Sequence, residues 1–246
     1  MSLRACLSST AAVLAAVLVS TAPSSASRAA TAAADAPAAV GPLFSLTPDG
    51  HLGNHFCTAT VVDSAHGDLV ATAAHCLQGQ TVGKFAFVPG YRNGIAPLGV
   101  WVVTRAFVDR AWSTSASPDD DFAFLVTSPP PLTARLEALT GAERVGGGEP
   151  VGRETTVVGY PSASDTAIAC SRALGRFTAT QMEFDCDGYT PGTSGSALVV
   201  GADPRTGLGT LVGVIGGYQE GGDTPAVSYA ATFGTRARAL YELAAR

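Results

Sequence analysis

The sequence predicts an all-β protein that ends in a single helix. Gly accounts for 28 of the 246 residues and only 14% of the residues are charged, a composition typical of a compact, turn-rich globular protein. Short runs rich in β-branched and aromatic residues recur along the chain, and Gly, Pro, Asp or Ser bounds each run. Only the last segment has the composition of a helix. The length allows one large domain or two small barrels packed as one unit.

The N-terminal segment, residues 1–27, has the features of a secretory signal peptide. Arg4 supplies a positive charge, Ala11–Val19 is a short apolar core, and small residues allow cleavage after Ala26 or after Ser27. A membrane anchor is the alternative, but a spanning helix needs about 20 apolar residues. We therefore expect a secreted, extracellular protein with no stable membrane anchor after the signal is removed.

Residues 28–40 follow the signal and consist mostly of Ala with Thr, Pro and Asp. They lack the periodic apolar pattern of a core segment. We expect a flexible arm or a short pro-segment here, and a folded domain over residues 41–246.

The folded domain is predicted to contain two series of strands. Pro129–Pro131 and Gly146–Gly148 interrupt regular structure, so the segment between them is the natural crossover between two halves. The halves are expected at about 41–130 and 145–234, followed by a helix over 235–246, where Arg236–Ala245 is rich in Ala, Leu, Glu and Arg. The predicted strands are His55–Val62, Leu69–Ala73, Lys84–Val88, Gly99–Val108 and Phe122–Val126 in the first half, and Thr155–Gly159, Arg172–Thr180, Gln181–Cys186, Ser196–Val200, Leu208–Ile215 and Ala226–Ala231 in the second.

The charge balance argues against a nucleic-acid partner. The formal net charge is -5, Lys84 is the one lysine of the sequence, and the arginines form no cluster. Binding to nucleic acid depends on neutralising phosphates with Lys and Arg. We therefore expect no nucleic-acid partner.

The cysteines predict disulfides. Signal removal takes Cys6 away and leaves Cys57, Cys76, Cys170 and Cys186. An even number of cysteines in an oxidising compartment predicts two bridges. Four cysteines allow three pairings, and spacing alone does not choose among them.

Three local motifs supply the parts of an activated serine nucleophile. Ser194 lies within Gly192–Ser196, and the imidazole of His75 lies in the run Ala73–Cys76; a carboxylate comes from the start of Asp121–Phe124. A serine alone is a poor nucleophile at neutral pH. It needs a base within hydrogen-bonding reach and a third group that orients the base. Small residues around the serine also permit a tight turn and a close approach of a substrate carbonyl.

The remaining histidines are less suited to catalysis. His51, His55 and His66 lie among turn-forming residues, so we expect all three to be exposed to solvent. The spacing of His51 and His55 would suit a metal site on a helix, but Gly53 and Asn54 argue against a helix there. We therefore predict no metal site.

Asp121 closes an acidic run that begins with Asp119 and Asp120. Such a run is usually a solvated turn, which is our expectation for Asp119 and Asp120. Asp121 differs because the apolar strand Phe122–Val126 begins directly after it. Asp120 is the alternative acid, but that choice would shift the strand by one residue and exchange its two faces. We favour Asp121.

In their order along the chain and in their flanking residues, these motifs resemble the chymotrypsin-like (trypsin-fold) serine peptidases. Pro191–Ser196 and Gly159–Pro161 are similar to the secreted bacterial branch, which includes the V8-like glutamyl endopeptidases. The resemblance extends from about Gly41 to Leu243 and implies two packed six-stranded antiparallel β-barrels with a C-terminal helix. It also implies a disulfide from Cys57 to Cys76, which leaves Cys170 to pair with Cys186.

The resemblance further implies a secreted serine endopeptidase that acts through an acyl-enzyme. His75, Asp121 and Ser194 would be the catalytic residues, and the N–H groups of Gly192 and Ser194 would form the oxyanion hole. No cofactor is required. We expect a monomer whose partners are protein or peptide substrates.

Two departures from the family bear on activation and specificity. Thr193 stands where animal members carry the Asp that pairs with a new N-terminus, so that switch is unavailable and the site must form without it. Gly188 carries no charge at the trypsin-like specificity position, and Ile215 replaces the histidine with which V8-like enzymes bind Glu. We predict an uncharged P1 residue. The predicted substrate-binding residues are Tyr189, Gly216, Gly217 and Tyr218, and Asp187, Glu220 and Asp223 would approach the pocket if the local alignment slips.

Two other functions fit the same residues. One is a non-catalytic binding or adhesion protein on this fold, although such proteins have usually lost a triad residue. The other is an esterase with the same triad, which only a protein substrate would distinguish from a peptidase. An α/β-hydrolase is disfavoured because its serine precedes the acid and the histidine in the chain.

Overall fold

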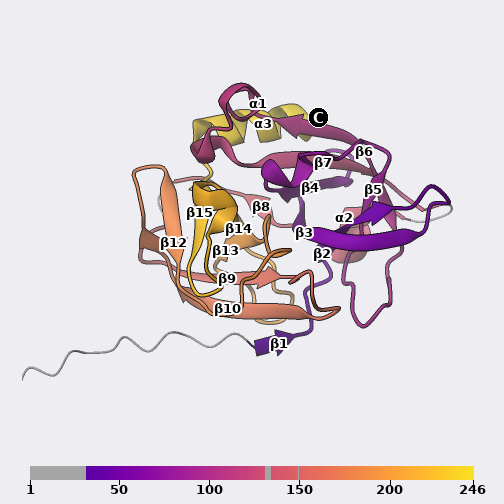
Figure 1. Ribbon diagram of the computed structural model, residues 1–246, viewed down its shortest axis with the longest axis horizontal. Coiled ribbons are helices and arrows are strands. Elements are labelled where there is room, and N and C mark those ends of the chain that lie inside the picture. Colours follow the sequence, from indigo (N-terminus) through magenta and orange to yellow (C-terminus); the bar gives the residue numbers. More distant parts are fainter. Residues whose placement is uncertain (1–31, 131–133, 149) are drawn as a thin grey trace, which may run out of the picture.

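The computed structural model describes residues 32–130, 134–148 and 150–246. Its strands form two antiparallel sheets that pack together, with one longer helix at the C-terminus (Figure 1). The predicted all-β fold class is confirmed. The predicted signal peptide, residues 1–27, lies outside the described residues. Among the described helices, none has the length and apolar composition needed to cross a membrane.

The first half is a closed barrel with the strand order β2-β3-β4-β7-β6-β5. Each pair of neighbouring strands is antiparallel, as in the pairing of Thr60 in β3 with Ala71 in β4. Large side chains that include Phe85, Trp101 and Leu125 are fully buried and fill the interior. The strands are β2 (Val40–Leu46), β3 (Leu52–Val62), β4 (Leu69–Thr72), β5 (Phe85–Phe87), β6 (Trp101–Val108) and β7 (Ala123–Ser128).

The second half is a barrel-like sheet with the order β1-β10-β9-β13-β14-β15-β12-β11, and β8 lies beside β14 in parallel. Six longer strands form its body, as predicted, and three strands of two or three residues extend it. The body consists of β9 (Glu154–Gly159), β10 (Ala167–Ala173), β12 (Gln181–Phe184), β13 (Ala197–Val200), β14 (Thr210–Ile215) and β15 (Ser228–Thr232); the short strands are β1 (Ala32–Ala34), β8 (Arg144–Val145) and β11 (Gly175–Arg176).

The largest differences between the predicted and observed strands concern β2 and β10. β2 was not among the predicted strands, although Val40–Leu46 pairs with both β3 and β5 to close the first barrel. β10 runs over Ala167–Ala173 rather than over Arg172–Thr180, and it also pairs with β1, which lies within the predicted arm. The domain boundaries themselves stay predictions.

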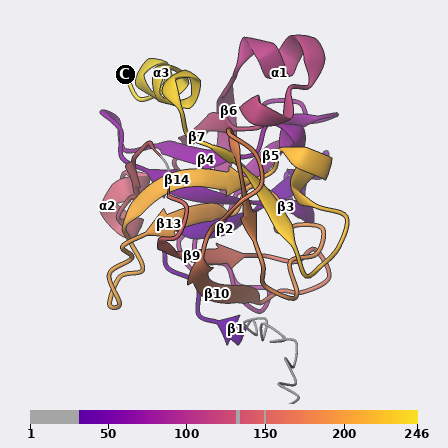
Figure 2. The ribbon, with the colours of Figure 1, turned by 90° about the vertical axis from the view of Figure 1, so that its left-hand side faces the viewer.

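The helices are short except at the C-terminus. They are α1 (Arg110–Ser115), α2 (Leu136–Thr140) and α3 (Thr235–Ala244), with single 3₁₀ turns η1 (His75–Leu77), η2 (Pro118–Asp120) and η3 (Tyr218–Gly221). α3 leaves the second sheet and packs back onto the first barrel, as Figures 1 and 2 show. The ring of Tyr241 lies 5.7 Å from that of Phe124, and its hydroxyl donates to the carbonyl of Asp63.

Apolar packing joins the two halves into one body. One buried cluster combines first-barrel side chains such as Val61 and Phe124 with Ala197, Leu211 and Phe233 of the second sheet. Burial of this apolar surface favours association of the two halves. Residues from both halves therefore lie side by side along the seam between them.

Candidate active site

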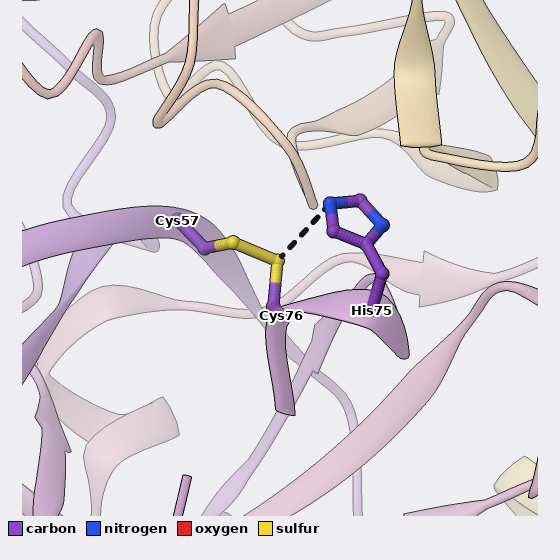
Figure 3. Close-up of side chains that lie close together, drawn as sticks. All are labelled: Cys57, His75 and Cys76. Carbon is purple, nitrogen blue, oxygen red and sulfur yellow. Dashed lines mark hydrogen bonds between the residues drawn. A yellow bond between two sulfur atoms is a disulfide. The ribbon is translucent and has the colours of Figure 1, made fainter. Parts of the chain in front are cut away.

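His75 lies at the seam, in the turn η1 directly after β4. A disulfide joins Cys76, its neighbour in the chain, to Cys57 in β3, which fixes this turn against the first barrel (Figure 3). The imidazole Nε2 lies 3.9 Å from the Cys76 sulfur, and the opposite ring nitrogen points away from the disulfide (Figure 3). The second disulfide joins Cys170 to Cys186. Both bridges are those that the resemblance implies.

Asp121 meets that opposite nitrogen. It follows η2, is fully buried, and accepts hydrogen bonds from the backbone N–H of His75 at 2.8 Å and from Nδ1 of His75 at 2.7 Å. The backbone N–H of Gly217, from the second sheet, donates to it at 2.8 Å. Three donors thus compensate the burial of the carboxylate. A carboxylate at Nδ1 leaves Nε2 of a neutral imidazole free to accept a proton.

The neighbouring acid Asp120 corrects one expectation. Its carboxylate is buried rather than solvated, because it accepts a hydrogen bond from the hydroxyl of Ser117 at 2.8 Å and pairs with Arg236 of α3 at 3.1 Å. Asp119 is exposed, as expected, and accepts from Gln181 at 2.8 Å. Of the three acids, only Asp121 contacts His75.

Ser194 lies in a turn whose hydrogen bonds leave two amides free. The N–H of Thr193 donates to the carbonyl of Thr190 at 3.1 Å, and the N–H of Ser196 donates to the carbonyl of Thr193 at 3.0 Å. Among the described residues, neither the N–H of Gly192, nor that of Ser194, nor the hydroxyl of Ser194 has a partner. Unpaired N–H groups beside a serine can donate hydrogen bonds to a negatively charged oxygen.

Gly192 permits this turn. Its φ is +101°, a conformation that L side chains rarely adopt, and a Cβ at this position would collide with Ser162 and with the carbonyl of Tyr160. The N–H of Ser162 donates to the carbonyl of Pro191 at 2.8 Å. In a trans peptide the carbonyl and the N–H point in opposite directions, so this bond turns the N–H of Gly192 away from Ser162.

A cavity of about 600 Å³ brings the predicted residues together. Its lining includes His75, Tyr189, Gly192 and Ser194. Tyr189 contributes ring surface, because its hydroxyl is already engaged in donating to the carbonyl of Val157 at 2.7 Å. Burial raises the pKa of Tyr189, so this hydroxyl stays protonated.

Three predicted pocket residues lie elsewhere, since none of them is in the lining of this cavity. Gly216 and Gly217 pack against Asp121. Tyr218 donates its backbone N–H to Gln181 at 2.8 Å, and its ring lies 5.2 Å from that of Tyr229. β14 ends at Ile215, and the chain then passes the carboxylate of Asp121 before η3 begins at Tyr218. These three residues therefore lie on the Asp121 side of the site.

The wall of the cavity is formed by residues other than these three. The buried side chains of Ile215 and Ser228 line the cavity, together with the exposed acids Glu220 and Asp223. Asp187 is not in the lining. The acids come from η3 and the turn after it, and Gln219 holds Asp223 by a hydrogen bond.

His55 corrects a further expectation. It is 7% exposed rather than solvated, because its side of β3 packs on Phe44 and Tyr91, with ring centroids 5.2 and 6.3 Å away. Burial lowers the pKa of His55, against the opposing charge of Asp165. His51 and His66 are exposed, as expected.

Within the described chain, one set of side chains gathers possible metal-binding atoms, namely Cys57, His75 and Cys76. The two sulfur atoms are bonded to each other, whereas a metal needs free thiolates. This set therefore does not form a metal site in the oxidised protein.

Sequence reasoning missed the supports of the site. The donors Gly217 and Ser162 act through their backbone N–H groups, which no side-chain pattern reveals. Thr58, which donates its hydroxyl to the carbonyl of Gly192 at 2.9 Å, is one of two threonines in β3. Its position directly after Cys57 was the available signal.

Comparison with known proteins gives consistent results. Residues 57–214 match the family model described as a trypsin-like peptidase domain. Among solved structures, the chain is similar to the protease Anisep from Arthrobacter nicotinovorans, with 24% identity, a TM-score of 0.73, and coverage of 87% of this chain and 99% of that one. It is similar to a thermostable serine protease from an extremophilic microorganism, with 26% identity, a TM-score of 0.70, and coverage of 85% and 97%.

A Glu endopeptidase in complex with MPD is also similar, with 15% identity, a TM-score of 0.66, and coverage of 90% of this chain and 99% of that one. At under 25% identity, this likeness and that to Anisep show the fold alone. No curated protein sequence matches the chain significantly.

Proposed function

Because the chain belongs to the trypsin-like peptidase family, we propose that it is a secreted serine endopeptidase whose catalytic residues are His75, Asp121 and Ser194. One observation carries the proposal: His75 pairs with the buried carboxylate of Asp121 at 2.7 Å, beside a cavity that Ser194 also lines. The other members of the family supply the reaction class, and the contacts of these residues supply their roles.

In the first step, Nε2 of His75 accepts the hydroxyl proton of Ser194 while Oγ attacks the carbonyl carbon of the scissile bond. The hydroxyl has no competing partner among the described residues. Hydrogen bonds of this kind often tighten only when substrate binds. The imidazolium that forms is stabilised by Asp121, which is held in place by Gly217.

The tetrahedral intermediate then collapses. Its oxyanion is bound by the N–H groups of Gly192 and Ser194, and His75 returns its proton to the leaving amine. The acyl group remains on Oγ as an ester. Water, deprotonated by His75, attacks this ester, and the acid product leaves with Ser194 protonated again. No cofactor takes part in either half of the reaction.

The site forms without the ion pair of the animal enzymes. Thr193 is 3% exposed and donates its hydroxyl to the carbonyl of Thr190 at 2.9 Å. This bond within the turn supports a nucleophile loop that needs no new N-terminus. Trimming of residues 28–40 would then be processing rather than an activation switch.

Secretion and substrate class belong to the same proposal. The predicted signal peptide and the two disulfides favour an oxidising, extracellular location. Ile215 and the ring of Tyr189 line the cavity, which favours proteins or peptides with an uncharged P1 side chain.

Hydrolysis of casein by the purified mature protein tests the proposal. Wild type is compared with Ser194→Ala, and a third sample is treated with phenylmethylsulfonyl fluoride. We expect hydrolysis by wild type alone and a covalent adduct on Ser194 in the treated sample. A folded, disulfide-bonded wild type that neither cleaves casein nor labels at Ser194 would contradict the proposal. Cleavage that persists in Ser194→Ala would contradict it as well.

A further inference from the structure

Thr58 connects the first barrel to the nucleophile loop of the second sheet. It lies in β3 directly after Cys57 and is fully buried. Its hydroxyl donates to the carbonyl of Gly192 at 2.9 Å and accepts from the backbone N–H of Tyr160 at 2.9 Å. The hydroxyl therefore joins two separate segments of the second half.

The backbone of Thr58 adds a second connection. Its N–H donates to the carbonyl of Ser194 at 2.8 Å, and its own carbonyl accepts from the hydroxyl of Thr72 in β4 at 2.8 Å. One residue thus bonds the loop on both sides of Thr193, at Gly192 and at Ser194. The bond from Thr72 in turn holds Thr58 against β4, the neighbouring strand of the first barrel.

Gly192 is the point at which such a tether is needed. A glycine with φ of +101° has an unusually wide range of accessible conformations. The bond from Ser162 fixes the peptide that precedes Gly192, whereas the bond from Thr58 fixes the peptide that follows it. The N–H of Thr193, at the other end of that peptide, donates to the carbonyl of Thr190 at 3.1 Å, which is a bond within the loop itself. The side-chain bond from Thr58 therefore ties this peptide to the first barrel, and without it the loop could shift and move Thr193 and Ser194 relative to the free N–H of Gly192.

We propose that Thr58 is a positioning residue of the oxyanion hole, which holds the carbonyl of Gly192 so that the N–H groups of Gly192 and Ser194 converge on one oxygen atom. The inference rests on the proposed function, since it assigns those two N–H groups to the oxyanion. The same strand segment also fixes the base, because Cys57 is bonded to Cys76 beside His75. β3 thereby sets the distance between the base and the oxyanion donors.

The test compares Thr58→Val with Thr58→Ser. Valine keeps the shape but loses both hydrogen bonds of the hydroxyl, whereas serine keeps them. Misplacing catalytic groups by about 1 Å can cost roughly 10²-fold, so we expect kcat of Thr58→Val to fall by about 10- to 100-fold with KM nearly unchanged. Thr58→Ser should restore most of kcat. The substrate is the best-cleaved peptide of a P1 series of Ala, Leu, Phe, Glu and Arg.

Thr60→Val is the matched control. Thr60 lies two residues further along β3 and is fully buried, but its hydroxyl has no partner among the described residues. Replacing it with valine should leave kcat unchanged and should not lower the melting temperature. The comparison separates the hydrogen bonds of Thr58 from a general response of β3 to valine.

Two further measurements distinguish positioning from loss of stability. A peptide aldehyde with the sequence of the best substrate forms a tetrahedral adduct whose oxygen occupies the oxyanion hole. Thr58→Val should weaken its inhibition by the same factor as kcat, while inhibition by the matching peptide amide stays unchanged. Deuterium exchange of residues 190–196 in the whole protein should accelerate in Thr58→Val and not in Thr60→Val.

The outcomes are separable. The positioning role would be overturned if wild type and Thr58→Val had the same kcat, the same affinity for the aldehyde and the same deuterium exchange. That result would leave the proposed function intact. A folded wild type that cleaves no peptide would count against the proposed function, and the exchange rates of residues 190–196 would then decide whether Thr58 holds the loop. Loss of activity in Thr58→Val and Thr58→Ser alike would also overturn the role of the hydroxyl.

Discussion

The backbone N–H of Gly217 donates to Oδ2 of Asp121 at 2.8 Å, and the same oxygen accepts from Nδ1 of His75 at 2.7 Å. Gly216 packs so closely that a Cβ there would lie 2.8 Å from this oxygen. The carboxylate is therefore held between a turn of the second sheet and the η1 turn of the first barrel. The position of Asp121 beside His75 therefore depends on contacts from both halves and not on either half alone.

Asp121→Asn tests this arrangement. The neutral amide cannot hold the imidazole in the tautomer that accepts a proton at Nε2, so we expect kcat to fall by about 10⁴-fold, as is typical of this change in a Ser-His-Asp triad. The measurement is kcat on the best peptide, with the fold checked by circular dichroism. Asp120→Asn is the control, because its partner Arg236 is largely exposed and the ion pair contributes little. A larger loss of kcat in Asp120→Asn than in Asp121→Asn would instead assign the role of the triad carboxylate to Asp120.

Gly192→Ala should inactivate the protein without unfolding it. The added methyl group would collide with Ser162 and Tyr160 at a φ of +101°, and relief of that collision would turn the N–H of Gly192 out of the oxyanion hole. Loss of one such donor costs about 10²–10³ in kcat. Gly234→Ala is the control, because a Cβ there meets nothing within 4 Å. Retained kcat in Gly192→Ala would contradict the assigned role of this amide.

The sequence predicted most of the strands because each has a local signal. Turn residues and β-branched runs mark β4 and β13 within a residue or two of their observed bounds. β2 was missed because Val40–Leu46 contains Gly and Pro and is a strand mainly through its pairing with β3 and β5. The start of β10 was missed for a similar reason: its Ala-rich sequence has weak β-propensity.

The side chains of the candidate site were predictable and its supports were not. His75 and Ser194 stand in distinctive local sequences, and the structure brings both to one cavity. The burial of His55 and Asp120 depends on partners far away in the chain, namely Tyr91 and Arg236. A single sequence does not reveal such partners, so both residues resembled exposed turn residues.

Removal of the disulfides separates stability from catalysis. The bridges close segments of 19 and 16 residues, so each contributes about 3 kcal/mol to the free energy of unfolding in the chain-entropy model. We expect similar losses of stability in Cys57→Ala/Cys76→Ala and Cys170→Ala/Cys186→Ala, measured by urea unfolding. Only the first pair should also lower kcat, because its cysteines adjoin Thr58 and His75. An equal effect of both pairs on kcat would contradict this division.

Glu143 predicts a pH-dependent stability. It is 1% exposed in the connection between the halves, and it accepts from the N–H of Gly209 at 2.6 Å. Burial raises its pKa from 4.5 to about 7. The folded state therefore binds this proton more tightly than the unfolded state, and the stability present below pH 4.5 declines as pH rises to about 7.

Glu143→Gln should remove that decline. A neutral amide still accepts from Gly209, so at pH 8 the variant should exceed wild type by up to about 3 kcal/mol in the free energy of unfolding, from roughly 2.5 pKa units at 1.36 kcal/mol each. At pH 4 the two proteins should be equal. Urea unfolding at both pH values checks this, with the exposed Glu154→Gln as the control. A gain that is the same at both pH values would contradict the linkage.

The cavity wall predicts the P1 preference. Burying a carboxylate requires a cation or several donors, whereas the wall contains the buried apolar residue Ile215. Among the described lining residues, Glu220 and Asp223 are the only acids, and none is Lys or Arg. Their repulsion of a carboxylate and the apolar wall both disfavour Glu at P1, despite the likeness in fold to a Glu endopeptidase.

A fluorogenic peptide series measures this preference. We expect kcat/KM for Leu or Phe at P1 to exceed that for Glu by at least about tenfold, which corresponds to roughly 1.4 kcal/mol. Ile215→His should raise the value for Glu. Cleavage only after Arg and Lys would overturn the prediction. The double variant Glu220→Gln/Asp223→Asn would then show whether the exposed acids cause that preference for basic residues. Because exposed charges are screened by salt, a preference of that origin would weaken at high ionic strength, whereas one set by Ile215 would not.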